Sequence, residues 1–175
     1  AASGQKAVPA PSLGRMVLWL LLSASASGFL VAVSANLSAN VAPIPLLWVV
    51  PLALYLLTFI LAFGNHRFYH PTWFFPWVTL SIGCLAFLYT QRLENWPIQY
   101  VMPLYLASLF IICMACHGEL VLRRPAGTYL TRFYLLISLG GVLGGAFVGL
   151  IAPNVFTTYV ELPVLLVLIA ELYVF

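Results

Sequence analysis

The chain has 175 residues, of which 63% are hydrophobic and only 6% are charged. Soluble domains carry about 25% charged residues, so this composition excludes a soluble globular protein and indicates a chain that lies in a lipid bilayer. Seven Lys and Arg against four Glu leave a small positive excess. These cations are too few and too dispersed for a nucleic-acid surface, and no nucleic-acid partner is expected.

Long apolar runs predict an all-α fold, a polytopic membrane bundle of about six transmembrane helices. A helix needs about 20 residues to cross roughly 30 Å of hydrocarbon. Short connectors rich in Pro, Gly and Asn separate the runs, which predicts antiparallel neighbours. The predicted spans lie at about 15–36, 45–63, 73–91, 99–122, 129–151 and 159–175.

This division leaves residues 1–14 as an N-terminal tail and 15–175 as a single transmembrane helical domain. The sixth run is short for a full span, so we expect the chain to continue past Phe175. Lys and Arg near the ends of spans favour the cytoplasmic side. The six-span topology puts only Arg92 on one face; the other carries Lys6, Arg15, Arg67, Arg123, Arg124 and Arg132. The tail is therefore predicted to be cytoplasmic.

The segment Cys113-Met114-Ala115-Cys116-His117 has the spacing by which c-type haem is attached covalently. Attachment needs both thiols and the imidazole exposed together. Here the segment lies inside an apolar run near its cytoplasmic end, whereas bacterial haem attachment takes place on the opposite side of the membrane. We favour two packed cysteines beside an interfacial histidine, and we expect no cofactor and no metal. A haem electron carrier is the remote alternative.

A polar cluster is predicted around the end of the fourth run. Glu119 and Arg123 are four residues apart in the order that favours an ion pair on a helix. Arg132 lies about as far past the following turn as Glu119 lies before it, which predicts an interhelical Glu119–Arg132 pair. With His117, these residues form either a structural staple of a hairpin, which we favour, or a binding or proton-relay site.

The fifth run contains glycines at four-residue spacing, and the first run has a smaller set of small residues, Ser23 to Gly28. In lipid, small residues let helix backbones approach closely. We therefore predict that these two helices pack against each other. The predicted packing glycines are Gly140, Gly141, Gly144, Gly145 and Gly149.

Three stretches resemble the membrane region of bacterial fused spermidine synthase-like proteins, which join a polytopic helical module to a cytoplasmic aminopropyltransferase-like domain. They are Ile44 to Phe59 (IPLLWVVPLALYLLTF), Cys116 to Leu120 (CHGEL) and Phe133 to Gly141 (FYLLISLGG). The resemblance implies a multi-pass protein of the bacterial cytoplasmic membrane and a cysteine-histidine pattern unconnected with haem. No acidic, glycine-rich nucleotide site of the enzyme domain occurs in this chain.

The expected function is that of a non-catalytic membrane module, a scaffold or accessory subunit that binds other membrane subunits of a larger complex, such as a respiratory or photosynthetic one. One alternative is half of a transporter, for which the polar residues Asn36, Asn40, Glu161 and Glu171 would serve. The other is the membrane anchor of a spermidine synthase-like enzyme domain.

Overall fold

The computed structural model describes residues 10–40, 46–65, 69–90, 97–125, 127–155 and 161–174, and all its regular elements are helical. The long helices are α1 (Leu13–Asn40), α2 (Leu46–Gly64), α3 (Pro71–Thr90), α4 (Ile98–Leu122) and α5 (Leu130–Ala146). The shorter elements are the 3-10 turn η3 (Gly127–Tyr129), the π-helical turn η4 (Phe147–Ile151), α6 (Ala152–Val155) and α7 (Glu161–Val174). The predicted all-α bundle is confirmed.

The expectation of about six full membrane spans is corrected to four. Within the described residues, the helical stretches long and apolar enough to cross a membrane are Leu13–Ser38, Pro71–Thr90, Gln99–Leu122 and Gly127–Val155. The apolar helix Trp48–Gly64 is shorter and rises about 26 Å, and α7 rises about 21 Å over its 14 residues. The 14 residues of α7 fall short of the roughly 30 Å of a bilayer core when the helix stands upright, whereas the 19 residues of α2 come close to it.

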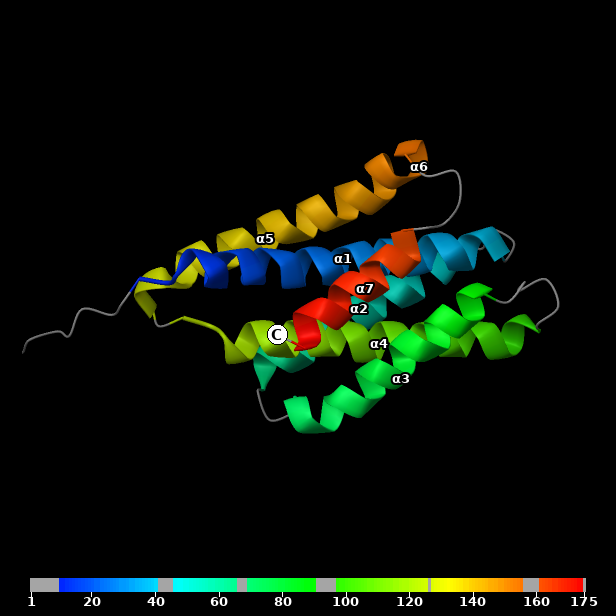
Figure 1. Cartoon of the computed structure of the whole chain (residues 1–175), viewed down its shortest axis with the longest axis horizontal. Coiled ribbons are helices and arrows are strands. Elements are labelled where there is room, and N and C mark those ends of the chain that lie inside the picture. The colour runs from blue at the N-terminus through cyan, green and yellow to red at the C-terminus, as the bar shows by residue number, and fades with distance from the viewer. Residues whose placement is uncertain are drawn as a thin grey trace, which may run out of the picture.

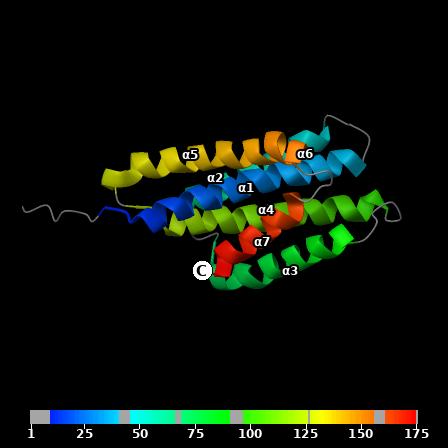
Figure 2. The ribbon, with the colours of Figure 1, turned by 45° about the horizontal axis from the view of Figure 1, so that its top comes forward.

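The first helix forms the centre of the bundle. It contacts α5 on one side and α4 on another, and it also touches α2 and α7 (Figure 1). A second view gives the same order, with α1 between α5 and α4 and with α3 outermost beyond α4 and α7 (Figure 2). Side chains of α1 that point into the core are fully or almost fully buried, among them Trp19, Phe29 and Val33.

Glycines of α5 bring its backbone directly onto α1. A Cβ added at Gly140 would collide with the carbonyl oxygen of Leu20, and one added at Gly144 would collide with that of Ala24. Ser23 adds a hydrogen bond from its hydroxyl to the Ile137 carbonyl oxygen, 2.6 Å away. The predicted pairing of the first and fifth helices is confirmed.

The other predicted packing glycines are not at the point of closest approach. A Cβ at Gly141 would lie 3.7 Å from the Ser23 hydroxyl, one at Gly145 3.4 Å from the Ser27 hydroxyl, and one at Gly149 3.9 Å from Val31. These are ordinary van der Waals separations. Successive residues of a helix differ by about 100° in direction, so one pair spaced by four faces the partner and the next pair lies beside the contact.

The backbone of the fifth helical stretch forms a wider, π-helical turn, η4, before the stretch ends. The N–H of Ala152 bonds to the carbonyl of Phe147, five residues earlier, which is π-helical spacing. Pro153 follows directly, and a proline has no N–H to donate and collides with the carbonyl four residues before it. The wider turn accommodates that proline inside a continuous helical stretch.

Candidate functional site

The last turns of α4 combine a buried histidine, His117, with a nearly buried carboxylate, Glu119. Residues 112 to 118 are all buried, and Glu119 follows with its side chain 12% exposed. Arg123, at the C-terminal cap of the helix, is 31% exposed. The carboxylate therefore lies just inside the point where the chain leaves the apolar bundle.

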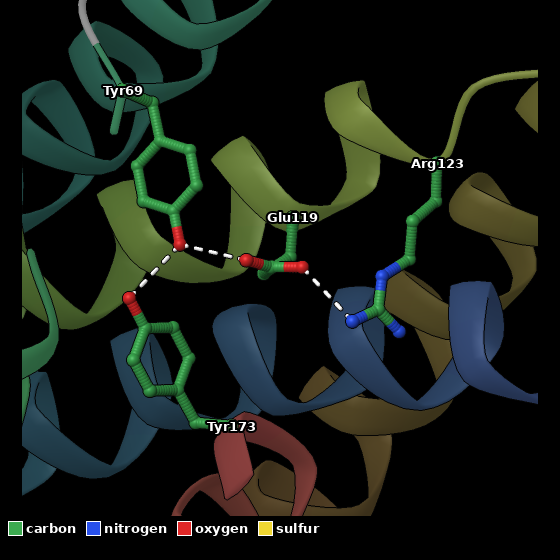
Figure 3. A network of polar contacts seen from close by, with 4 residues as sticks. All are labelled: Tyr69, Glu119, Arg123 and Tyr173. Carbon is green, nitrogen blue, oxygen red and sulfur yellow. Dashed lines mark hydrogen bonds and ion pairs between the residues drawn. The ribbon is translucent and has the colours of Figure 1, made fainter. Parts of the chain in front are cut away.

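Both oxygens of the Glu119 carboxylate are engaged. The hydroxyl of Tyr69 donates a hydrogen bond to Oε1 over 2.9 Å, and the Arg123 guanidinium lies 3.1 Å from Oε2. The Tyr173 hydroxyl lies 2.9 Å from that of Tyr69. Because the one hydrogen of the Tyr69 hydroxyl points to Glu119, Tyr173 must be the donor to Tyr69. Figure 3 shows the two tyrosines meeting on one side of the carboxylate and the arginine on the other.

This directed chain, here called the Glu119 network (Tyr69, Glu119, Arg123 and Tyr173), connects three parts of the fold. Tyr69 comes from the connector before α3, Glu119 and Arg123 from the end of α4, and Tyr173 from the last turn of α7. Hydrogen bonds to an ionised group are stronger than neutral ones, and they satisfy a carboxylate that would otherwise be costly to bury. The network holds α7 and the connector before α3 against α4.

The ring of Tyr69 reaches the carboxylate because residue 118 is glycine. A Cβ at Gly118 would overlap the Tyr69 ring, so any larger residue would displace the tyrosine from α4. Tyr69 is almost completely buried. Burial first, and then its hydrogen bond with Tyr173 and the charge of Glu119, raise the pKa of Tyr69 well above its usual value. The hydroxyl therefore stays protonated and remains a donor.

His117 faces a different helix and belongs to a second polar contact. Its Nδ1 lies 3.1 Å from the Thr58 hydroxyl oxygen on α2. Thr58 donates its own hydrogen to the carbonyl of Tyr55, 2.7 Å away, so His117 must supply the hydrogen of the shared bond from Nδ1. The rings of Tyr55 and Phe59 meet the imidazole edge to face at 5.0 and 5.3 Å. This contact joins α4 to α2.

The predicted pair between Glu119 and Arg132 is wrong. Glu119 pairs with Arg123 on its own helix, and Arg132 is exposed. The hairpin geometry behind the prediction does not exist, because α1 lies between α4 and α5 (Figure 2). Of the predicted cluster, Glu119 and Arg123 are brought together, whereas His117 points to α2 and Arg132 to the outside.

The packing of the Cys-His segment does not fit a covalently bound haem. Cys113 and Cys116 are buried, and the Cys113 thiol points to the Ala26 carbonyl of α1 at 3.8 Å. His117 points instead to Thr58 of α2. Attachment requires two thiols and an imidazole on one open face. Among the described residues, no group of three or more His, Cys, Asp or Glu is placed to hold a metal ion.

The residues considered for a transport site lie on two helices, Asn36 and Asn40 on α1 and Glu161 and Glu171 on α7. Asn36 donates to the carbonyl of Ala32, four residues earlier on its own helix, at 2.9 Å. Glu161 is buried at the first turn of α7, where a carboxylate suits the helix dipole. Glu171 is exposed on α7. The side chain of Asn40 lies outside the described residues.

The residues that sequence reasoning missed are Thr58, Tyr69 and Tyr173. Each is a hydroxyl-bearing side chain in or beside an apolar run, and no spacing relates them to Glu119 or His117. A tyrosine next to a connector, as Tyr69 is, resembles an interfacial anchor in sequence. Only the packing of α2, α3 and α7 around α4 brings these hydroxyls to the carboxylate and the imidazole.

No protein-family model matches this chain, and comparisons with curated proteins and with solved structures give no match either. The resemblance to fused spermidine synthase-like proteins therefore stays a prediction from the sequence.

Proposed function

We propose that this chain is a non-catalytic membrane module that serves as a scaffold or accessory subunit of a larger complex in the bacterial cytoplasmic membrane. The observation that carries the proposal is the full engagement of Glu119. Each of its oxygens has a partner within the chain, so this carboxylate links the connector before α3 and the end of α4.

The outer faces of the bundle support the same proposal. Large apolar side chains are exposed along several helices, including Trp48 and Ile60 on α2, Val142 on α5 and Leu150 on η4. Such faces suit contact with lipid or with apolar surfaces of other membrane subunits. Two hollows beside α3 are lined almost entirely by apolar side chains, which suits contact with lipid or with an apolar partner.

Copurification tests the scaffold role. The tagged full chain would be extracted from bacterial membranes in a mild detergent, and its partners identified and then tagged in turn. We expect a partner that copurifies with this chain, and that retrieves this chain when the partner carries the tag, with the same ratio of the two proteins in both experiments. A monomer without partners, in membranes cross-linked before extraction, would contradict the proposal. A soluble enzyme domain as the constant partner would instead identify the chain as an anchor.

The proposed orientation puts the N-terminus in the cytoplasm. The described arginines Arg15, Arg123, Arg124 and Arg132 belong to the start of α1, the end of α4 and the start of α5, which lie at one end of the bundle (Figure 1). Lys6, Arg67 and Arg92 lie outside the described residues. Reporter fusions after Arg124 would test this: a fluorescent cytoplasmic reporter should be active there, and periplasmic phosphatase activity at that position would reverse the orientation.

A further inference from the structure

One side of α7 packs against the bundle, and its outer side is exposed. The exposed residues recur at three- and four-residue spacing, so they share one face of the helix. They are Val164, Val167 and Glu171, here called the Glu171 face. Buried side chains, among them Leu165 and Ile169, point the other way. The outer side of this apolar helix therefore carries a carboxylate.

The packing of α7 on α3 gives the depth of Glu171 in the bundle. The ring of Tyr173 stacks on that of Phe75 at 6.0 Å, and Ala170 lines a small cleft together with Val78. Glu171 lies between these two contacts along α7, so it is level with a point about 9 Å past the start of α3. Since α3 is long and apolar enough to span a membrane, this point lies well inside one leaflet.

The packing of α7 on α1 gives a similar depth. The two helices run in opposite directions (Figures 1 and 2). A Cβ added at Gly28 would lie 3.4 Å from the Leu165 side chain, so these two residues are level. Gly28 is about 22 Å along α1 from its start, and Glu171 is about 9 Å along α7 from Leu165 toward that same end. The carboxylate is therefore about 13 Å inside the start of α1.

The described structure contains no cation for this carboxylate. Among the described residues, Glu171 has neither a hydrogen bond nor an ion pair. Charged side chains in transmembrane segments are costly when they face hydrocarbon, and they almost always meet a polar partner. The short side chain of Glu cannot reach the interface over a distance of about 10 Å. The exposed carboxylate therefore calls for a partner group at the same depth.

We propose that the Glu171 face docks on a transmembrane helix of another membrane protein, which presents a Lys or Arg side chain to Glu171. The interface rests on the proposed scaffold role and specifies the chemistry of the partner. Charge complementarity identifies the occupant, because lipid tails carry no cation at this depth. A partner at this depth has to be helical, since helices satisfy their own backbone groups in lipid.

The described residues of a second copy of this chain do not supply that cation. Gly140 lies against the carbonyl of Leu20, which puts Arg132, about two turns earlier on α5, level with the start of α1. Arg15 lies at that same start, and Arg123 caps the end of α4. These guanidinium groups belong to the edge of the membrane spans, about 10 Å from the level of Glu171.

Photo-crosslinking of the full chain in intact membranes tests the interface. A photoreactive benzoylphenylalanine would replace Val167, which lies one turn before Glu171 on the same face. Val142 of α5 is the matched position for control, because the two valines are similarly exposed, 63% and 68%. We expect a protein adduct from position 167 that position 142 does not give. The linked peptide should contain a Lys or Arg within about one helical turn of the linked residue.

Copurification in a mild detergent measures the contribution of the charge. Glu171→Gln keeps the shape of the side chain and should lower the recovered partner about tenfold, because it strands the partner's cation in an apolar interface. Arg132→Gln removes an exposed charge from another helix and should leave recovery unchanged. Glu171→Lys, combined with a change of the partner's cation to Glu, should restore the complex.

Equal recovery of the partner with Glu171→Gln, or a linked peptide without a nearby Lys or Arg, would overturn this interface and leave the scaffold role standing. Absence of a protein adduct at position 167 would overturn the interface too. So would an adduct with this same polypeptide, which would identify a second copy or an internal contact as the occupant. Absence of any copurifying protein would overturn both the interface and the scaffold role.

Discussion

Gly144 of α5 lies directly against the backbone carbonyl of Ala24 on α1, with no room for even a methyl group between them. A Cβ added at the neighbouring Gly141 would lie 3.7 Å from the nearest side chain, at the hydroxyl of Ser23. Both residues are glycines of the same helix, three positions apart, and they differ in how closely α1 approaches them. They therefore make a matched pair for substitution.

Gly144→Ala should therefore destabilise the bundle, whereas Gly141→Ala should not. Overpacking a close contact costs about 1–3 kcal/mol, while alanine in place of glycine favours a helix by about 1 kcal/mol where space allows. Thermal unfolding of both variants in the same detergent would measure the difference. Similar melting temperatures for the two variants would show that the α1–α5 contact is looser than the structure indicates.

Gly118→Ala should displace Tyr69 from α4, because the added methyl group overlaps the Tyr69 ring. The displaced hydroxyl can no longer donate to Glu119, so the variant loses packing and a charge-assisted hydrogen bond together. We expect a loss of about 2–3 kcal/mol in the free energy of unfolding. Gly83→Ala, where the added methyl group meets nothing, is the control. Tyrosine fluorescence or hydrogen exchange near Tyr69 that is unchanged in Gly118→Ala would contradict this account.

Tyr69→Phe keeps the ring and removes only the hydroxyl at the centre of the Glu119 network. A hydrogen bond to a charged group contributes about 1.5–3 kcal/mol, and the Tyr173 hydroxyl also loses its acceptor. The variant should be destabilised by at least about 1.5 kcal/mol. Tyr100→Phe, on a residue that is 66% exposed, should have little effect. If a double variant of Tyr69→Phe with Tyr173→Phe lost the sum of the two single effects, the two hydroxyls would not be coupled.

Arg123 and Arg132 should respond differently to loss of charge. Arg123→Gln breaks the ion pair with Glu119, but the partly exposed guanidinium limits the cost to about 1 kcal/mol or less. Arg132→Gln should leave stability unchanged, since its side chain is exposed and α1 separates its helix from α4. The measurement is thermal unfolding of both variants at low and high salt. Equal losses of stability would contradict this account and would support the interhelical Glu119–Arg132 pair that the sequence predicts.

The helical class and the existence of each helix follow from the sequence, because apolar runs of bilayer length leave a backbone few alternatives to helix in lipid. The packing of the first helix on the fifth also follows, since small residues at four-residue spacing allow close approach. The number of full spans does not follow from the sequence. An apolar run indicates that a segment lies in lipid, but where its helix begins and ends also depends on prolines and on the neighbouring helices.

The Glu119 network shows where sequence reasoning stops. The i to i+4 spacing of Glu119 and Arg123 is a local relation, and the sequence alone determined it. Tyr69 lies 50 residues from Glu119, and Tyr173 lies 104 residues from Tyr69. Only tertiary packing brings these hydroxyls together, because contacts of that separation depend on which helices are neighbours. The same packing places α1 between α4 and α5 and so decides against the Glu119–Arg132 pair that spacing alone predicted.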